Sequence, residues 1–289
     1  SILAEVVEPG TVVGKLLADV QTEVGGGENL VVVAPAEHDT ASAVVAVPAQ
    51  GEDFAYLSCG TWSLLGVETD EPVLSPAAMD GGLTNEGGAG AKIRLLKNIM
   101  GLWLLQQSRR RWQWEGESYS YAELTQMAEE APAFSSLIDP DDPQFLNPHS
   151  MPEAIEDYCR RTGQHVPQSK GQVCRTILES LALKYRWSLD RLREATGKKL
   201  DVLHIVGGGI QNKLLCQFAA NACGVRVVAG PVEATAIGNL MVQAIAIGEV
   251  ENIGKAREVI ATSFPPEIYL PQDQDAWETQ YNRFLTLLK

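Results

Sequence analysis

Cysteine is scarce in this sequence and shows no pattern that would bind metal or form a disulfide framework. The five cysteines are spread over 289 residues, and no two of them form a C-x-x-C pair. The odd number and low density favour free thiols in a reducing compartment, so we expect a cytoplasmic protein. Cys159 and Cys174, which bracket a predicted loop, form the alternative, a single disulfide. The four histidines show no ligand spacing with the cysteines, and we expect no metal site built by the protein alone.

Basic residues and long apolar runs are also few. Lys and Arg number 23 against 37 Asp and Glu, which gives a formal net charge of −14. This excess disfavours non-specific binding to nucleic acid or to anionic membranes. No apolar run reaches the ~20 residues that cross a bilayer, and residues 1–5 lack the basic region and apolar core of a signal peptide. We therefore expect neither nucleic acid nor membrane as a partner, whereas a small anion held by backbone amides is compatible with the charge.

The remaining composition is that of a globular protein. Hydrophobic residues make up 45% and charged residues 21%, and the length suits one large domain or two small ones. Residues 1–29 contain turn signals at 8–11 and 25–28, a short helical stretch at 15–20, and Ser1 in place of an initiator Met. We expect residues 1–29 to be the remains of an inter-domain segment and residues 30–289 to form the main domain.

Three consecutive glycines, Gly207, Gly208 and Gly209, join an apolar run at 200–206 to an amphipathic run at 213–222. This order predicts strand, turn and helix. Glycines allow a close approach to the backbone, and amides at a helix start favour negative charge, so a bound nucleotide is one interpretation and a ligand-free tight turn is the other. A dinucleotide-binding oxidoreductase is disfavoured, because Asn212 breaks the G-x-G-x-x-G spacing and the next strand, Val225–Val228, brings no acidic ribose partner.

His38, Asp39 and Thr40 stand between a short β-branched run at 30–34 and a stretch rich in small apolar residues at 41–47. The first pattern predicts a buried strand and the second a helix. Ligands of open α/β folds bind at the carboxyl ends of strands, where these three residues are expected. The alternative is that Asp39 or Thr40 is only the N-cap of the helix.

Two hairpins and a helix are predicted next. Residues 54–58 and 63–67 surround Cys59-Gly60-Thr61-Trp62, where Gly60 and Thr61 can offer an N–H group and a hydroxyl to a phosphate or form an ordinary turn. Residues 81–96 suggest a second hairpin. The apolar spacing of 97–113 predicts a helix, with Asn98 in its first turn and Gln106 about two turns later.

The other predicted elements form a mixed α/β pattern. Residues 132–152 form a proline-punctuated loop, and Arg109–Arg111 form a solvated helix end. A strand is expected at 225–229, and helices are expected at 119–131, capped by Ser118 or Ser120, and at 151–162, 169–196, 233–247, 251–263 and 273–288.

Six stretches taken in order resemble a known family. The resemblance runs from Pro35 to about Gly248 and is to the carboxyl-terminal domain of the FGGY carbohydrate kinases, most closely their rhamnulokinase branch. The stretches are Glu37–Ala43, Ser58–Ser63, Thr84–Gly88, Leu95–Gln106, His204–Asn212 and Ala229–Thr235.

The resemblance implies the fold and the reaction. The family has the actin/hexokinase ATPase fold, in which ribonuclease-H-like domains carry a mixed sheet flanked by helices, and ATP and sugar meet between two such domains. The implied reaction is ATP + L-rhamnulose → ADP + L-rhamnulose 1-phosphate, with Mg²⁺ as a further cofactor.

The resemblance also implies site residues. Asp39 resembles the catalytic base, His38 and Thr40 flank it as sugar contacts, and Asn98 matches a sugar-side position. The nucleotide side would comprise Thr61, Gln106, Asn212 and the three glycines Gly207, Gly208 and Gly209.

One departure from the family pattern leaves alternatives open. The Asp-x-Gly strand and phosphate-binding hairpin of the family's first domain have no match before Pro35. We therefore expect an amino-terminal domain as a missing partner and no activity from this chain alone. The sugar could also be L-fuculose or L-xylulose, and a non-catalytic actin-like nucleotide-binding module is the alternative from another class.

Overall fold

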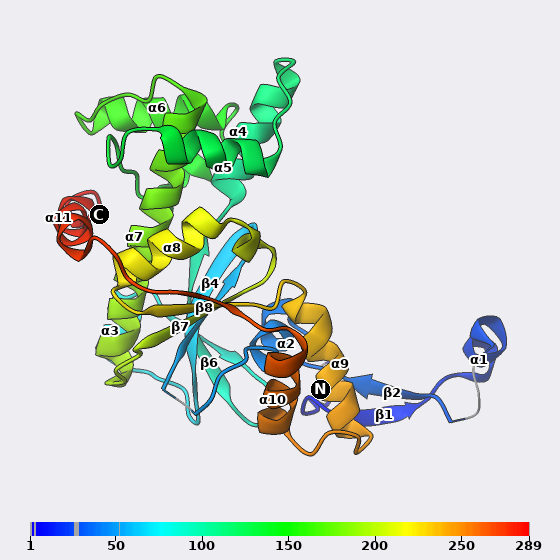
Figure 1. Cartoon of the computed structure of the whole chain (residues 1–289). Helices are drawn as coiled ribbons and strands as arrows, with labels where there is room; N and C mark the ends of the chain where they lie inside the picture. The colour runs from blue at the N-terminus through cyan, green and yellow to red at the C-terminus, as the bar shows by residue number, and fades with distance from the viewer. Residues whose placement is uncertain (1, 3, 26–28, 52, 289) are drawn as a thin grey trace.

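The computed structural model of the chain describes residues 2, 4–25, 29–51 and 53–288. It contains a seven-stranded mixed sheet with helices on both faces, and a two-stranded hairpin that projects from the body (Figure 1). The strands of the large sheet are, in chain order, β3 (Ala55–Cys59), β4 (Trp62–Thr69), β5 (Thr84–Gly87), β6 (Ile93–Met100), β7 (Val202–Val206), β8 (Arg226–Ala229) and β9 (Glu267–Tyr269).

The order of these strands brings distant parts of the sequence together. Across the sheet the order is β5-β6-β4-β3-β7-β8-β9. Strands β3, β7 and β8 are parallel, and every other neighbouring pair is antiparallel. The carboxyl ends of β3 and β7 therefore lie side by side, although about half of the chain separates them in sequence. This edge is where ligands of α/β sheets bind.

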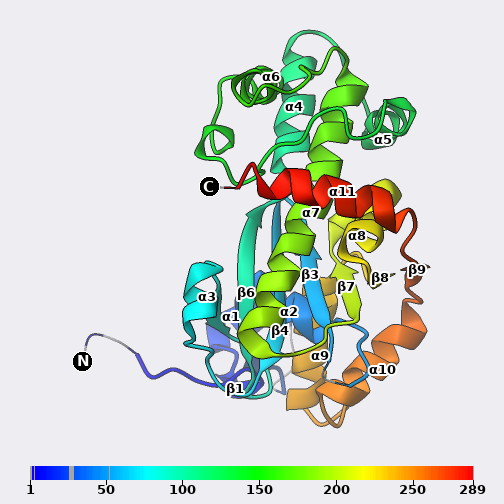
Figure 2. The ribbon, with the colours of Figure 1, turned by 90° about the vertical axis from the view of Figure 1, so that its left-hand side faces the viewer.

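One face of the sheet is covered by α7 (Lys170–Thr196), which runs along it in Figure 2. Ser169 caps the helix through its side chain, and Gly197 ends it in the left-handed conformation. Neither α7 nor any other helix in the described part of the chain is long and apolar enough to cross a bilayer. Around it lie α4 (Trp103–Trp114), α5 (Tyr121–Glu130), α6 (Met151–Arg161), α8 (Lys213–Cys223) and α11 (Gln274–Leu285).

The opposite face is covered by α2 (Asp39–Val45), α9 (Ala234–Ala246) and α10 (Ile253–Ser263). Successive side chains of β3 point to opposite faces of the sheet and so belong to two separate core clusters. Ala55 and Leu57 pack toward α7, whereas Tyr56 packs with α2 and α9. Gly238 of α9 lies so close to α2 that an added Cβ would be 1.8 Å from the carbonyl oxygen of Ser42. The small residues of α9 thus serve close helix packing, as the sequence predicts.

The amino-terminal segment departs from prediction. It contains β1 (Thr11–Lys15), α1 (Ala18–Val24) and β2 (Val31–Ala34), and β1 pairs only with β2. The prediction of a buried strand at 30–34 is wrong in its burial, because Val31 and Val32 are exposed. A two-stranded hairpin has too little surface of its own to cover both faces. The predicted helix at 15–20 begins later, and positions 26–28 of the predicted turn lie outside the described residues.

The predicted helix at 97–113 is wrong in about its first third. Strand β6 continues to Met100 because it pairs with β4 over its whole length, from Ile93 opposite Thr69 to Met100 opposite Trp62. Asn98 is therefore a strand residue, and α4 begins only at Trp103. The short elements α3 (Pro76–Asp80) and β9 were not predicted; β9 has only three residues and follows two prolines.

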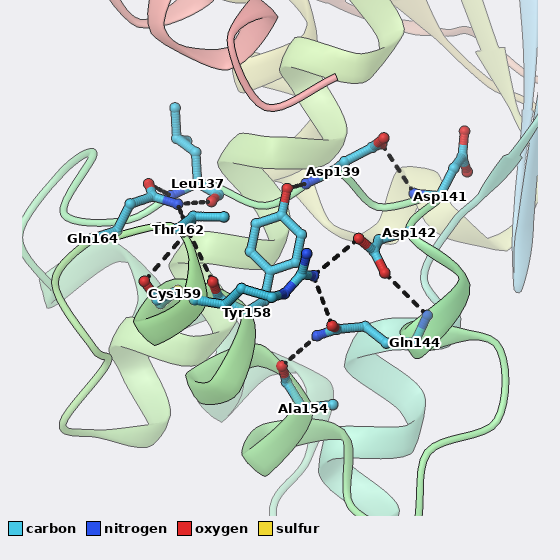
Figure 3. Close-up of polar contacts among 11 residues, drawn as sticks. Leu137, Asp139, Asp141, Asp142, Gln144, Ala154, Tyr158, Cys159, Thr162 and Gln164 are labelled. Atoms are coloured by element: carbon cyan, nitrogen blue, oxygen red, sulfur yellow. Dashed lines mark hydrogen bonds and ion pairs between the residues drawn. The ribbon is translucent and has the colours of Figure 1, made fainter. Parts of the chain in front are cut away.

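The proline-rich loop between α5 and α6 is irregular but well held, with one 3₁₀ turn, η1 (Pro143–Phe145). Its backbone groups bond to side chains of α6 and of the segment after it (Figure 3). The hydroxyl of Tyr158 accepts from the Asp139 N–H at 3.1 Å, and the Gln164 amide bonds both backbone groups of Leu137. Side chains thus provide hydrogen-bond partners for backbone N–H and C=O groups of this loop, as strand or helix neighbours do in regular secondary structure.

All five cysteines lie among the described residues, and all are free and buried. Burial raises the pKa of the Cys59 and Cys159 thiols to about 11 and that of Cys174 to about 12. They are therefore neutral thiols at physiological pH. The expected free thiols are confirmed, and Cys159 and Cys174 are not linked.

Replacing Gly238 by Ala should push α2 and α9 apart and lower the free energy of unfolding by about 1–3 kcal/mol or more. Chemical denaturation of the purified protein measures this change. Ala236→Ser, on an exposed position of the same helix, should change it by less than about 0.5 kcal/mol. Equal stability of Gly238→Ala and the parent would contradict the close packing.

His204, buried in β7, should make stability depend on pH. Burial, followed by the charges of Arg257 and Arg226, lowers the pKa of this imidazole from 6.5 to about 4. Between these values the unfolded chain binds a proton that the folded chain excludes, so stability is retained above pH 6.5 and falls by about 3 kcal/mol as the pH drops toward 4. In His204→Gln this loss should disappear, whereas the exposed His149→Gln should retain it. A parent-like acid loss in His204→Gln would refute the assignment.

Candidate functional site

A cleft of about 670 Å³ opens at the carboxyl ends of β3 and β7. Its walls are the start of α2, the turn between β3 and β4, the residues after β7 and the loop that enters α9. Seven residues singled out from the sequence line it together, namely His38, Asp39, Thr40, Thr61, Asn98, Gly207 and Gly208. Residues predicted for the sugar and for the nucleotide therefore share one cavity.

Asp39 is the first residue of α2, and its carboxylate is exposed and does not cap the helix. His38 holds the N-cap position, so the alternative that Asp39 or Thr40 is the N-cap is wrong. Within the part of the chain that the structure describes, Asp39 Oδ1 accepts hydrogen bonds from the N–H (2.6 Å) and hydroxyl (3.3 Å) of the adjacent Thr40 alone, and the side chain is 77% exposed. A carboxylate so placed can accept a proton from a ligand in the cleft.

His38 joins Asp39 to a second carboxylate. Its Nε2 lies 3.6 Å from Asp39 Oδ1, and its Nδ1 lies 3.8 Å from Glu86 Oε2. Glu86, on β5, accepts a 3.0 Å hydrogen bond from Nη2 of the buried Arg94 on β6. The sequence assigned no role to Glu86 or Arg94, since neither stands next to Asp39 along the chain.

The turn between β3 and β4 supplies a hydroxyl, but the amide of Gly60 is not available as a donor. The Gly60 N–H closes the turn by donating to Trp62 O at 2.8 Å, so the predicted offer of this amide to a phosphate is wrong. Thr61 Oγ1 donates to Gln106 Oε1 at 3.1 Å. Because the N–H of Trp103 donates to Thr61 O, the start of α4 is fixed against the turn. Gln106 does not line the cleft but contacts a residue that does.

The three glycines differ in the space that the structure leaves for a side chain. Gly207 has a φ of 93°, and a Cβ there would lie 2.9 Å from Cys59 O. A Cβ on Gly209 would lie 2.2 Å from Cys59 Sγ, whereas one on Gly208 would meet nothing within 4 Å. Gly207 and Gly209 thus serve packing against the end of β3, although Gly207 also lines the cleft, and Gly208 alone of the three has room for a Cβ.

The helix that follows starts later than predicted. Gly208 and Gly209 belong to a 3₁₀ turn, η2 (Gly208–Gln211), which precedes α8, so the prediction that the glycine amides lie at the start of an α-helix is wrong. Asn212 caps α8, accepting from the Leu215 N–H at 2.9 Å, and its Nδ2 donates to Thr125 Oγ1 at 3.2 Å. Asn212 and Gly209 lie outside the cleft lining, and their nucleotide contacts stay predictions.

The loop into α9 forms a wall that sequence reasoning missed. Glu233 and Thr235 line the cleft, and the Thr235 hydroxyl donates to the backbone oxygen of Asp39 at 3.2 Å. Trp62, 48% exposed, lines the wall beside Asn98. The sequence assigned the α9 stretch to packing alone; the available signal was the Gly230-Pro231 turn directly after a strand parallel to β7.

The described residues include no group of three or more His, Cys, Asp and Glu side chains that could hold a metal ion. The carboxylates that line the cleft are those of Asp39 and Glu233. Hard oxygen donors of this kind suit Mg²⁺ that arrives with a nucleotide and keeps phosphate and water ligands.

Comparison with known sequences identifies the domain. Residues 55–247 match the model of the "FGGY family of carbohydrate kinases, C-terminal domain". The chain is 51% identical over 276 residues to a rhamnulokinase from Bacteroides thetaiotaomicron, covering 96% of this chain and 56% of that protein. It is 46% identical over 294 residues to a rhamnulokinase from Enterococcus faecalis, covering 100% and 58%. The chain thus spans somewhat more than half the length of these curated relatives.

Solved structures agree in fold. A xylulose kinase from Rhodospirillum rubrum superposes with a TM-score of 0.71 at 19% identity, covering 97% of this chain and 56% of that one. A Plasmodium falciparum glycerol kinase with ADP gives a TM-score of 0.65 at 15% identity, covering 96% and 54%. The predicted class, a mixed sheet flanked by helices in the actin/hexokinase-like manner, is confirmed. The chain belongs to the FGGY family of carbohydrate kinases and contains the carboxyl-terminal domain of that family.

Proposed function

We propose that this chain is the carboxyl-terminal half of a cytoplasmic kinase that transfers the γ-phosphoryl group of ATP to L-rhamnulose, giving L-rhamnulose 1-phosphate. The exposed carboxylate of Asp39, in one cleft with Thr61 and Gly208, is the observation that carries the proposal. The choice of sugar follows the relatives named rhamnulokinase at 41–51% identity.

Asp39 acts as the general base in this proposal. A sugar hydroxyl attacks the γ-phosphorus, and the carboxylate accepts its proton as the new bond forms. His38 and Thr40 flank the base and would contact the sugar together with Asn98, which lines the same cleft. The Thr235 bond to the Asp39 backbone and the packing of α2 on α9 keep the carboxylate in place. A fixed base costs little reorganisation at the moment of reaction.

The nucleotide would lie on the β3–β4 and β7 side of the cleft. The Thr61 hydroxyl and the backbone at Gly208 face the space that phosphates would fill, and Gln106 holds Thr61 from α4. This side of the cleft would be held in place by packing at Gly207 and Gly209 and by the cap that Asn212 forms on α8. Mg²⁺ bound with ATP, near Asp39 and Glu233, would offset the negative charge of the phosphoryl group.

The other half of the relatives' length would supply the opposite wall. The β1–β2 hairpin exposes Val12, Val13, Val31 and Val32, an apolar surface that suits packing against another domain. We propose that an amino-terminal domain covers this hairpin and completes the sugar pocket. Residues 1–289 alone should accordingly not phosphorylate the sugar.

In the full-length protein, Asp39→Asn should lower kcat for L-rhamnulose by about 10²–10⁴-fold, because the amide cannot accept the proton. ATP affinity, measured by calorimetry, should stay at the parent value. Asp275→Asn, on the remote α11, serves as the matched control and should retain full activity in a coupled ADP-release assay. Near-normal turnover by Asp39→Asn would exclude the base role and favour a non-catalytic nucleotide-binding module; turnover of L-fuculose or L-xylulose in preference would correct the sugar.

Two neighbouring glycines should respond differently to an added methyl group. Gly208→Ala should raise the Kd for ATP about tenfold without changing the melting temperature, because its methyl enters the open cleft. Gly209→Ala should lower stability by about 1–3 kcal/mol through its clash with Cys59 Sγ. Adding Cys59→Ala to Gly209→Ala should restore part of that loss. Unchanged ATP affinity in Gly208→Ala would show that the nucleotide binds elsewhere.

A further inference from the structure

We infer that Glu86 is a positioning residue, which holds the imidazole of His38 beside Asp39 and thereby sets the affinity for the sugar. The inference rests on the proposed function, since His38 is the sugar contact through which Glu86 would act. It concerns a residue that does not line the cleft.

Glu86 reaches His38 across two separate parts of the fold. His38 precedes α2, whereas Glu86 belongs to the edge strand β5. The imidazole lies between the carboxylates of Asp39 and Glu86, with Nε2 toward the first at 3.6 Å and Nδ1 toward the second at 3.8 Å. Both distances are longer than hydrogen bonds, as is common at sites without substrate, where such contacts tighten on binding.

Arg94 makes Glu86 a fixed partner. Its side chain is about 2% exposed, Nη2 donates to Glu86 Oε2 at 3.0 Å, and Nε donates to Gly87 O at 2.9 Å. Glu86 and Arg94 are also directly opposite each other in the β5–β6 ladder. A buried guanidinium that loses its carboxylate is strongly destabilised, so Glu86 is not free to turn away.

The neighbours of Glu86 serve the same arrangement. The Asn85 side chain bonds both backbone groups of Val73, accepting at 2.9 Å and donating at 3.0 Å, which fixes β5 on its outer side. A Cβ on Gly88 would lie 2.8 Å from Lys92 O and 3.4 Å from Arg94 Cγ. The segment Thr84–Gly88 is therefore built to carry one carboxylate at a defined place under His38.

When a carboxylate contacts Nδ1 of an imidazole, the orientation of Nε2 is fixed as well. A carboxylate at Nδ1 orients the ring and selects which nitrogen faces the reacting groups, as in other sites where histidine acts with an acidic partner. Nε2 then stays next to Asp39, where the sugar hydroxyl must be placed. Without Glu86 the half-exposed imidazole can rotate away from Asp39. Binding of the sugar must then fix the ring again, and the conformational entropy lost in doing so lowers the affinity.

A neighbouring ion pair provides a control for a purely structural role. Glu68 on β4 also lies opposite Arg94 in the ladder, but its carboxylate accepts from Arg257 Nη2 at 2.7 Å. Glu68 is part of a comparably buried pair and makes no contact with His38 among those described. Glu68→Gln should therefore reproduce the loss of an ion pair without any loss of positioning.

The experiment compares Glu86→Gln, Glu86→Ala and Glu68→Gln in the full-length protein. We expect the KM for L-rhamnulose to rise about tenfold in Glu86→Ala and less in Glu86→Gln, which keeps an acceptor oxygen, while the KM for ATP stays at the parent value. Melting temperatures should fall in all three variants, and the sugar KM of Glu68→Gln should be that of the parent. An equal rise in Glu68→Gln, or no rise in Glu86→Ala, overturns the inference.

A second measurement is independent of turnover. In crystal structures of the substrate-free parent and Glu86→Gln, the imidazole of His38 should occupy one orientation in the parent and more than one, or a different one, in the variant. An unchanged ring overturns the positioning role. If the parent phosphorylates no ketose, the proposed function fails by itself, and the ring orientation still decides whether Glu86 positions His38.

Discussion

The site depends on the close approach of two turns that are far apart in the sequence. The residues after β7 can lie against the end of β3 only because Gly207 and Gly209 have no side chains where Cys59 presents its carbonyl oxygen and sulfur. Pairing of β3 with β7 brings the strands into register, and the glycines let the chain continue past Cys59 without a clash. Gly208 and Thr61 thereby face the same space. A larger residue at either packing position would open the cleft before any ligand was bound.

A second close approach places the proposed base. Helix α2 lies against α9 at Gly238, and Thr235 at the start of α9 bonds to the backbone of Asp39. Next to the start of the same helix, the partly exposed Glu86 pairs with the buried Arg94 and lies 3.8 Å from His38. Packing and the Thr235 hydrogen bond therefore hold the backbone of Asp39, and the Glu86–Arg94 pair lies beside His38. A fixed backbone at Asp39 and an exposed carboxylate suit a cleft that a second domain completes.

Much of the fold follows from local patterns in the sequence. The strand before the triple glycine, the β3–β4 hairpin, and the capped helices α5 and α7 are where periodicity and turn residues predict them. Only the start of the helix predicted at 97–113 is wrong, because apolar residues such as Ile99 and Met100 suit a buried strand as well as a helix. Pairing with β4 decided for a strand there. The burial of 30–34 failed because an apolar run does not say whether anything is packed against it.

The site was predictable residue by residue but not as a geometry. The sequence by itself determined that Thr61 follows one strand of the sheet and Gly208 another, and the family resemblance named both of them and Asp39. The expectation that Asp39 follows a buried strand of the sheet is wrong, because β2 pairs only with β1 and is exposed. Only the tertiary structure decided that Gly207 and Gly209 serve packing, that Asn98 lies on a strand, and that Glu86 reaches His38. The physical reason is that periodicity and capping act within a few residues along the chain. Contacts between β3 and β7, or between β5 and the start of α2, depend instead on strand order and on side-chain volume across the core, which no local pattern records.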